Sequence, residues 1–343
     1  MNQPLVSAII STYNSEEFIK GRLDNLIEQT IFNDIEIIIV NSGSKQNEER
    51  IIVEYAKMYS NIKCIKTENR ETVYKAWNRG IKISKGKYIT NTNTDDRLRE
   101  DALEILSEAL NKNPDKAIVY ADQYITNIPN ALFKDIKLID KKKKFNRLNY
   151  SRLKQLSGYI AGPQSMWKSS LHFKDNIWFD ETFEVSGDND FVCRVAEKYD
   201  LMRVSGVLGI YYKSKDNSNR EFRNFEGTYE ESLKVKEKYL RRYIRSLTPD
   251  KKKILLRKIF LYKKIPHNLI SIINRIIFLV NPAMAIPRRE FMFLVASTFE
   301  ELEGNNEKAI EYCKAYISGR ADSLMKRQYK RLTTGSGVNI NFE

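Results

Sequence analysis

Two adjacent carboxylates, Asp95 and Asp96, follow an apolar run in the stretch "GKYITNTNTDDRL" (86–98). Neighbouring carboxylates repel each other, and they are costly near a core unless a cation joins them. Mg²⁺ and Mn²⁺ prefer such oxygen ligands, with water or phosphate completing the shell. The pair is therefore a candidate site for a divalent cation. The structural alternative is that both aspartates cap the helical segment that follows at 99–110.

Five short runs rich in Ile, Val and Tyr predict the strands that must position these side chains. The predicted strands, each buried on both faces, span residues 5–12, 34–42, 61–67, 86–93 and 116–125. Apolar residues at helical spacing lie between them, at 19–27, 51–59, 73–81 and 103–110. This alternation predicts an α/β fold with a mostly parallel sheet covered by helices on both faces.

Polar clusters end three of the predicted strands: "STYN" (11–14), "VNSGS" (40–44) and "TNTDD" (92–96, after Asn91). Parallel strands end at one rim of a sheet, where ligands bind, so we expect the clusters to converge. No GxGxxG or GxxxxGK[ST] motif occurs, which argues against a dinucleotide or P-loop site. Each cluster also has a structural interpretation: Asn14 with Glu17 fits a helix capping box, and residues 42–44 fit a turn.

Five segments, in order, resemble a family 2 glycosyltransferase of the GT-A fold. They are "VSAIISTYNSEEFIKGRLDNLIEQT", "IEIIIVNSGSKQNEERI", "AWNRGIKISKGKYITNTNTDD", "AGPQSMWKSSLHF" and "FDETFEVSGDNDFVCRVAEKY". The resemblance covers about residues 4–213. It implies a Rossmann-like, mostly parallel sheet flanked by helices, and an inverting, nucleotide-sugar-dependent transferase.

The resemblance also implies where the donor and a metal bind. Asp96, together with Asp95, would hold Mn²⁺ or Mg²⁺ under the diphosphate of the donor. The implied nucleotide-sugar site consists of Thr12, Tyr13, Asn14, Glu16, Asn41, Ser42, Arg79, Asn93, Thr94, Asp95 and Gln164. Arg79 equally fits a cation at a helix C-terminus beside Gly80.

The same resemblance implies the catalytic base. Inverting transfer needs a carboxylate that takes the proton of the acceptor hydroxyl, and Asp188 in "SGDNDFVCRVAEKY" (186–199) stands at the family's position for it. Asp190 would fix the local geometry, and capping of the helix that begins here is the alternative. The chain departs from the family pattern at Asn41 with Ser42, where an acidic pair is common, and at Asn93 and Gly187.

Composition limits the partners. The 343 residues carry 58 Lys and Arg against 44 Asp and Glu, a formal charge of +14, which favours an anionic partner. Nucleotide phosphates and an anionic membrane surface qualify, whereas nucleic acid is disfavoured because no aromatic and basic recognition platform is evident. Three widely spaced cysteines and the lack of a secretory signal at the start predict a cytoplasmic protein, peripheral at the inner face of the membrane if it binds lipid.

The last third of the chain differs in character. We expect residues 1–219 to form the GT-A domain and residues 220–343 an all-α C-terminal domain, with a tetratricopeptide-like helix pair near 293–318 and a loose tail. The apolar segment 265–287 is interrupted by polar residues, and no uncharged stretch in it reaches the roughly 18 residues that a membrane-spanning helix needs, so we expect a core helix or a basic amphipathic surface. The C-terminal helices are candidates for a homo-oligomer contact.

Two functions from different classes remain. The first is a metal-dependent inverting glycosyltransferase that uses a UDP-sugar and acts on a glycan, lipid-linked or protein acceptor, as in cell-surface polysaccharide synthesis. The second is a noncatalytic GT-A-like scaffold whose basic helical domain binds a membrane, nucleic acid or a protein. The departures at Asn41, Asn93 and Gly187 would support the second.

Overall fold

The computed structural model describes residues 3–135, 144–214, 225–264, 269, 272–273, 289–317 and 323–334. The chain forms two compact units, one of residues 1–151 and 159–231 and the other of residues 152–158 and 232–343. The first unit contains the sheet, and the described part of the second is helical. The boundary predicted at 219–220 stays a prediction.

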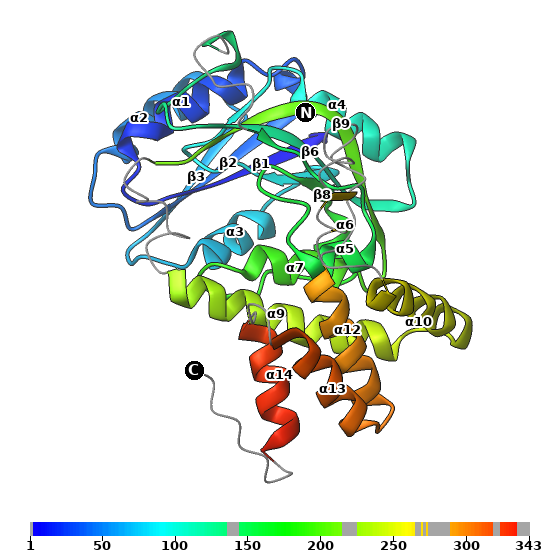
Figure 1. The fold of residues 1–343 in the computed structure, drawn as a ribbon. Helices are drawn as coiled ribbons and strands as arrows, with labels where there is room; N and C mark the ends of the chain where they lie inside the picture. The colour runs from blue at the N-terminus through cyan, green and yellow to red at the C-terminus, as the bar shows by residue number, and fades with distance from the viewer. Residues whose placement is uncertain are drawn as a thin grey trace. The chain divides into compact units, whose positions relative to one another are not determined.

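The described strands form one mixed sheet in the order β3-β2-β1-β4-β8-β6-β9-β5, with β7 paired to β6 (Figure 1). The strands are β1 (Val6–Thr12), β2 (Ile35–Ser42), β3 (Ile62–Thr67), β4 (Tyr88–Asn91), β5 (Arg97–Leu98), β6 (Lys116–Thr126), β7 (Lys144–Phe145), β8 (Met166–Lys168) and β9 (Asp200–Tyr212). β1 pairs in parallel with both β2 and β4, so strand order reverses at β1. β8 runs antiparallel to its neighbours β4 and β6.

Helices cover both faces of this sheet. In the first unit they are α1 (Glu16–Ile27), α2 (Glu48–Met58), α3 (Val73–Lys82), α4 (Ala102–Lys112), α6 (Ser170–Phe173) and α7 (Gly187–Val195), with 3-10 turns η1 (Phe32–Asp34) and η2 (Phe133–Asp135). The second unit contains α5 (Arg152–Ser157), α10 (Pro249–Lys264), α12 (Arg289–Leu302), α13 (Asn306–Ile317) and α14 (Ser323–Thr333). α9 (Phe225–Arg245) begins in the first unit and continues into the second.

The five predicted strands and four predicted helices are confirmed, in order, as β1, β2, β3, β4 and β6 and as α1 to α4. The prediction that residues 61–67 are buried on both faces is wrong. Lys63, Cys64 and Lys66 are exposed because β3 is the edge strand. A lysine pattern of this kind is typical of a protected sheet edge.

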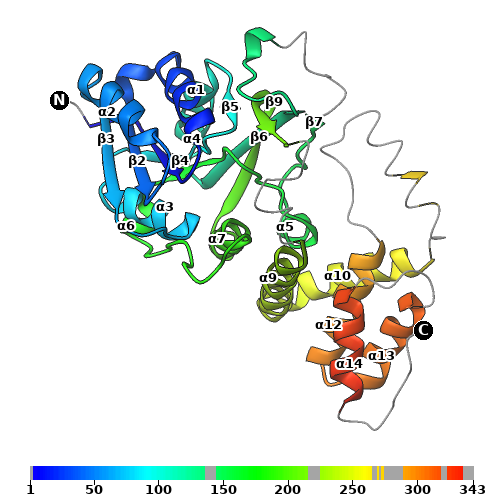
Figure 2. The same ribbon diagram turned by 90° about the vertical axis from the view of Figure 1, so that its left-hand side faces the viewer.

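Alternation along β1 separates two cores. Val6, Ala8 and Ile10 pack against α1, α2 and α4, whereas Ile9 faces the core formed with α3 and α7. Figure 1 shows α1 and α2 on one side of the sheet and α3 on the other, and Figure 2 shows α6 and α7 on the α3 side. A strand buried on both faces explains the continuous apolar sequence of β1.

Trp167 belongs to the second core. It is buried on β8, and its indole N–H donates to Nε2 of His172 at 2.7 Å. Burial lowers the pKa of His172 to about 4, so the imidazole is neutral at pH 7 and accepts this bond. Both residues therefore have a structural role.

α12 and α13 form the helix pair that the sequence predicted near 293–318. Gly304 has a φ of +86° in the turn, and the Ser297 hydroxyl donates to the carbonyl of buried Ala309 at 2.9 Å. Likeness to a tetratricopeptide repeat stays a prediction. The segment 265–287, except 269 and 272–273, and the tail from 335 lie outside the described residues. None of the helices in the described part of the chain is long and apolar enough to cross a membrane.

A buried glutamate at the N-terminal end of β2 joins this strand to the start of β1 and to the residues before β4. The Glu36 carboxylate accepts hydrogen bonds from the Ser7 hydroxyl at 2.7 Å, the Gly86 N–H at 3.1 Å and the Lys85 N–H, and it pairs with Lys63 at 3.0 Å. Burial alone would raise its pKa, but these hydrogen bonds outweigh burial, and the pKa of Glu36 lies below its usual value.

Glu36→Gln is expected to reduce the free energy of unfolding by about 1–3 kcal/mol at pH 7. The Glu36 carboxyl group binds a proton less tightly in the folded protein than in the unfolded chain. The stabilisation by the ionised Glu36 carboxylate is therefore complete above the unfolded-state pKa and is lost as pH falls through the lower folded-state pKa. Urea unfolding at about pH 7 and pH 3.5 measures it, with the exposed Glu54→Gln as control. An equal cost at both pH values would contradict this assignment.

Candidate functional site

A buried carboxylate joins the loops that follow β1 and β2. Glu48, in the first turn of α2, accepts a hydrogen bond from the Ser15 N–H at 2.6 Å and another from the Thr12 hydroxyl at 3.4 Å. Its second oxygen accepts from the Ser44 hydroxyl. The convergence expected for the first two strand ends is therefore present, with Glu48, which the sequence did not single out, between them.

Asn14 bridges the same two loops and does not cap α1. Its φ is +51°, and its side-chain oxygen accepts from the Ser44 hydroxyl at 3.3 Å and the Lys45 N–H at 3.1 Å. α1 begins at Glu16 after Ser15, with no side-chain capping bond. The Glu16 carboxylate instead accepts from the Asn47 N–H at 3.3 Å, so the capping-box alternative is wrong.

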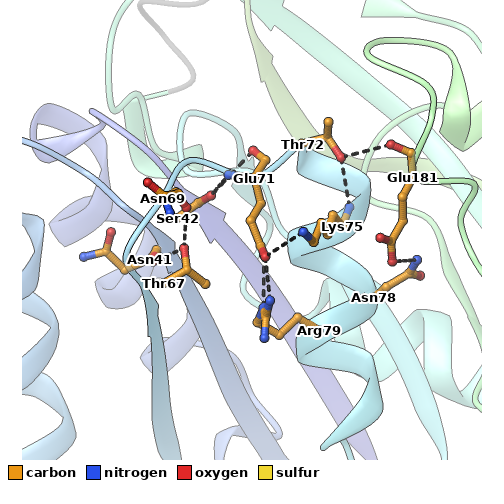
Figure 3. A network of polar contacts seen from close by, with 10 residues as sticks. All are labelled: Asn41, Ser42, Thr67, Asn69, Glu71, Thr72, Lys75, Asn78, Arg79 and Glu181. Atoms are coloured by element: carbon orange, nitrogen blue, oxygen red, sulfur yellow. Dashed lines mark hydrogen bonds and ion pairs between the residues drawn. The ribbon is translucent and has the colours of Figure 1, made fainter.

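Asn41 and Ser42 end β2 and organise the turns beside it (Figure 3). Asn41 is buried, and its side-chain oxygen accepts from the Ser44 N–H at 3.1 Å. The Ser42 hydroxyl accepts from the Glu71 N–H at 2.6 Å. Neutral side chains thus fix the β2–α2 turn and the β3–α3 loop at the positions where the resemblance led us to expect an acidic pair.

Arg79 is engaged by a carboxylate of the protein itself. Figure 3 shows its guanidinium facing Glu71, to which it donates from Nε at 3.0 Å and from Nη2 at 2.5 Å. Lys75 approaches the same carboxylate at 3.4 Å. Hydrogen bonding to Glu71 raises the pKa of Arg79. Its place in the last turn of α3 fits the helix-terminus alternative, and diphosphate binding by Arg79 stays a prediction.

Arg70 is a candidate that sequence reasoning missed. Its guanidinium carbon lies 4.5 Å from the ring centroid of Tyr13. The β3–α3 loop approaches the β2–α2 turn closely at Gly43, whose φ is +64° and where a Cβ would lie 2.8 Å from the backbone of Asn69. Only glycine fits there, and the close approach places Arg70 over Tyr13. No motif in "ENRE" (68–71) signals this stacking.

Two buried arginines hold the backbone of the loop between β4 and β5. Arg22 of α1 donates to the Asn93 carbonyl at 2.8 Å and to the Asp96 carbonyl. Arg97 donates to the Thr94 carbonyl at 2.7 Å and to the Asp96 carbonyl at 2.6 Å. Both guanidiniums donate to main-chain oxygens of this loop, which fixes the backbone that carries Asp95 and Asp96.

The Asp96 carboxylate is buried in this loop. It accepts from the Tyr212 N–H at 3.0 Å and from the Asn93 amide at 3.3 Å. Burial raises the pKa of Asp96 well above its usual range, and the negative charge of Asp95 raises it further. The helix-cap alternative is wrong because α4 begins at Ala102 after its N-cap residue.

A short loop connects Asp96 with Asp188. Gln164, with a φ of +62°, donates to the Ile210 carbonyl at 3.2 Å and hydrogen-bonds the Asp96 carboxylate. Tyr159 hydrogen-bonds the Asp188 side chain. Five residue steps separate Tyr159 from Gln164, at most about 18 Å of chain. The loop 159–164 therefore has a polar contact with each of the two carboxylates, and the catalytic role of Asp188 stays a prediction.

A carboxylate from α9 fixes the start of the helix that carries Asp188. Glu231 accepts from the N–H groups of three consecutive residues, Glu184, Val185 and Ser186, at 2.8–2.9 Å. Asp188 itself accepts the Asn189 N–H at 2.7 Å, whereas the N-cap residue of α7 is Ser186, which makes no side-chain capping bond. Glu231 lies beyond the resembling segments, and sequence reasoning missed it.

Gly187 and Asp190 complete the first turn of α7. A Cβ on Gly187 would lie 2.8 Å from the ring of Tyr74, so the glutamate that the resemblance led us to expect does not fit without a shift of that ring. Asp190 is buried and pairs with Arg194 at 2.7 Å. The pair supports the predicted structural role of Asp190.

The donor atoms of the β4–β5 loop fit a divalent cation in part. Among the described residues, no three His, Cys, Asp or Glu side chains gather as a complete metal site. Asp95, Asp96 and the Asn93 amide nevertheless supply oxygen donors of the kind that Mg²⁺ and Mn²⁺ use, and a bound diphosphate with water completes such a shell. Metal binding by this loop stays a prediction.

Comparison with known proteins gives a consistent result. Residues 7–172 match the model of glycosyl transferase family 2. Poly(ribitol-phosphate) beta-glucosyltransferase of Bacillus spizizenii is 29% identical over 218 residues, which are 61% of this chain and 32% of that protein, so the chain spans about a third of this relative.

Two solved structures share the fold. S. aureus TarS 1-349 in complex with UDP-GlcNAc aligns with a TM-score of 0.59 and 15% identity over 98% of this chain and 93% of that chain. A mannosyltransferase from Pyrobaculum calidifontis in complex with GDP-Man and Mn²⁺ aligns with a TM-score of 0.54 and 15% identity over 98% of this chain and 81% of that chain. The GT-A fold with C-terminal helices is thereby confirmed.

Arg22→Lys is expected to reduce the free energy of unfolding by about 2–4 kcal/mol, because an ammonium lacks the fork that reaches two carbonyls and remains a poorly paired buried cation. Urea unfolding measures the loss. Arg50→Lys is the matched control, since Arg50 is exposed on α2 and pairs with Glu54; its cost should stay within about 0.5 kcal/mol. Equal losses in both variants would refute the role given to Arg22.

Proposed function

We propose that the chain, whose residues 7–172 match the model of glycosyl transferase family 2, transfers a sugar from a nucleoside-diphosphate sugar to a hydroxyl group with inversion at the anomeric carbon. The observation that carries this proposal is the loop 159–164, which contacts Asp96 at one end and Asp188 at the other. Inverting transfer needs such a pair of carboxylate positions, one for the diphosphate and one for the acceptor.

The donor is proposed to be a UDP-sugar. Tyr13 and Arg70 offer an aromatic face and a cation for a pyrimidine and its carbonyl oxygens. The loops fixed by Glu48 and Ser42 hold both residues at the end of β1 and beside β2. The structural neighbour with UDP-GlcNAc supports this choice, whereas the neighbour with GDP-Man makes guanosine the alternative to test.

The metal proposal rests on Asp96 and Asp95. A divalent cation, when bound, supplies neutralisation of the charge that develops on the departing diphosphate. On the protein side, Arg22 and Arg97 donate to carbonyls of this loop and so hold the backbone that carries both carboxylates. The Tyr212 N–H orients the buried Asp96 carboxylate.

Asp188 is proposed as the base. Its carboxylate takes the acceptor hydroxyl proton while that oxygen forms a bond to the anomeric carbon and the bond from this carbon to the diphosphate oxygen breaks. The products are the glycosylated acceptor, with inverted configuration, and a nucleoside diphosphate. Glu231 holds the backbone that precedes Asp188 and acts as a positioning residue.

A glycan, a lipid-linked sugar or a protein is the proposed acceptor class, and cell-surface polysaccharide synthesis is the proposed setting. The relative that is named for poly(ribitol-phosphate) glucosylation supports a polymer acceptor. The scaffold alternative loses support because Asn41, Asn93 and Gly187, which depart from the family pattern, each have a structural reason here. Cytoplasmic location and homo-oligomerisation stay predictions.

UDP with Mn²⁺ is expected to raise the melting temperature by about 5 °C at a hundredfold excess over its Kd. Asp96→Asn, which keeps an oxygen for the Tyr212 N–H, should remove this shift, whereas Asp115→Asn on the surface should not. A thermal-shift screen of UDP, GDP and their sugars, with and without Mn²⁺, measures it. No shift with any nucleoside diphosphate would favour the scaffold function.

Asp188→Asn is expected to keep the UDP–Mn²⁺ melting shift but to slow transfer by a factor of about 10² to 10⁴, because an amide cannot accept the proton. Release of UDP from the UDP-sugar that the screen identifies, with water or an added glycan as acceptor, gives the rate. Asp180→Asn is a control on the preceding loop. A rate within a factor of three of the wild-type value would exclude Asp188 as the base.

A further inference from the structure

The face of α10 away from its packing side combines large apolar and basic side chains. Ile254, Leu256, Phe260 and Leu261 are 53%, 40%, 55% and 57% exposed. Lys251, Lys253, Arg257 and Lys258 are also exposed among them. Asp250 is the one acidic residue in the sequence of this helix.

The opposite side of α10 anchors the helix in its own unit. Leu255 and Ile259 are buried, and α10 packs beside α12 (Figure 1). Lys252 pairs with Glu303 at 2.6 Å and lies over the Phe299 ring. The helix therefore has a satisfied inner side, and its outer side is a separate surface that needs its own explanation.

Charge and shape together select one kind of partner for this outer side. A second copy of the same face would bring like charges together, which disfavours self-association. A polyanion such as nucleic acid would satisfy the basic residues but leave the apolar side chains in water. An anionic lipid surface satisfies both, because headgroups attract Lys and Arg while Leu, Ile and Phe enter the acyl boundary.

We propose that the outer face of α10, defined by Ile254, Leu256, Phe260, Leu261 and the exposed basic residues among them, docks the protein on an anionic lipid bilayer. The helix lies in the interface and does not span it. The surface is distinct from the strand-end cluster, so docking does not depend on the proposed transfer reaction. A docked enzyme would meet acceptors that are themselves confined to the membrane.

Vesicle co-sedimentation of the full chain tests the apolar part of the proposal. We expect binding to phosphatidylcholine vesicles that contain 30% phosphatidylglycerol and no measurable binding to pure phosphatidylcholine. Phe260→Ser should weaken binding by about fivefold or more. Phe173→Ser is the matched control, because Phe173 is 54% exposed in the first unit, and it should bind as the wild type does.

The basic part has its own pair of variants. Arg257→Glu with Lys258→Glu should weaken vesicle binding at least about thirtyfold, and added salt should weaken the wild type too. Lys57→Glu with Lys174→Glu changes the net charge equally on exposed residues of the first unit and should lower binding by less than threefold. Circular dichroism melting confirms that all variants are folded.

Three outcomes would overturn the proposal. The first is equal loss in test and control variants, which means that binding follows net charge alone. The second is no vesicle binding by the wild type, with sedimentation that depends on protein concentration and is altered by Phe260→Ser, which means that the face joins two copies. The third is that the protein binds RNA, that Phe260→Ser does not change this binding, and that no vesicle binding occurs. This result would mean that the face binds a polyanion.

Discussion

The candidate site depends on α1 holding the extended chain after β4 by buried polar side chains. Arg22, Asn25 and Gln29 lie three and four residues apart on one face of α1 and its C-terminal extension, and all three are buried. Arg22 binds the carbonyls of Asn93 and Asp96, Asn25 both donates to and accepts from the backbone of Leu98, and Gln29 binds the Arg99 carbonyl at 2.9 Å. Each buried donor would be costly without its carbonyl, so the loop has little freedom to move. The position of the aspartate pair follows from this constraint.

The parts of the fold that repeat locally were predictable from the sequence. Apolar runs and helical spacing predicted β1, β2, β4 and β6 and helices α1 to α4. In each of these elements the spacing of apolar residues along the sequence matches the residues that are buried in the structure. The strand-end position of Asp95 and Asp96 followed from the same pattern. Burial of β3 failed because an edge position is a property of the whole sheet. β5 and β7 were missed because two residues carry no period.

The side chains that organise the site were less predictable, since their partners are distant in sequence. Arg22 binds a carbonyl 74 residues away, and Glu231 binds an N–H 47 residues away. Glu48 reads as an ordinary acidic residue in a first helical turn, yet it joins two loops. Gly187 was visible in the sequence as a departure from the family pattern. The structure explains it by the Tyr74 ring, which packs against Gly187. A departure from a pattern can thus point to local packing as well as to lost function.

The same departures change the electrostatics of the strand-end rim. Asn41, Ser42 and Asn93 are neutral where relatives often carry carboxylates, and each is used for hydrogen bonding: Asn41 to the Ser44 N–H, Ser42 to the Glu71 N–H and Asn93 to Asp96. Negative charge at the ends of β1, β2 and β4 is therefore concentrated in the Asp95–Asp96 pair, apart from Glu16 and Glu48, which bind loop N–H groups. A diphosphate that approaches this rim meets less repulsion than it would beside three carboxylate clusters. Electrostatic repulsion is weaker when fewer like charges are present and when they are farther away. If the proposed function holds, the proposed cation site at Asp95 and Asp96 and the Tyr13–Arg70 stack would therefore contribute most to the selection of the donor.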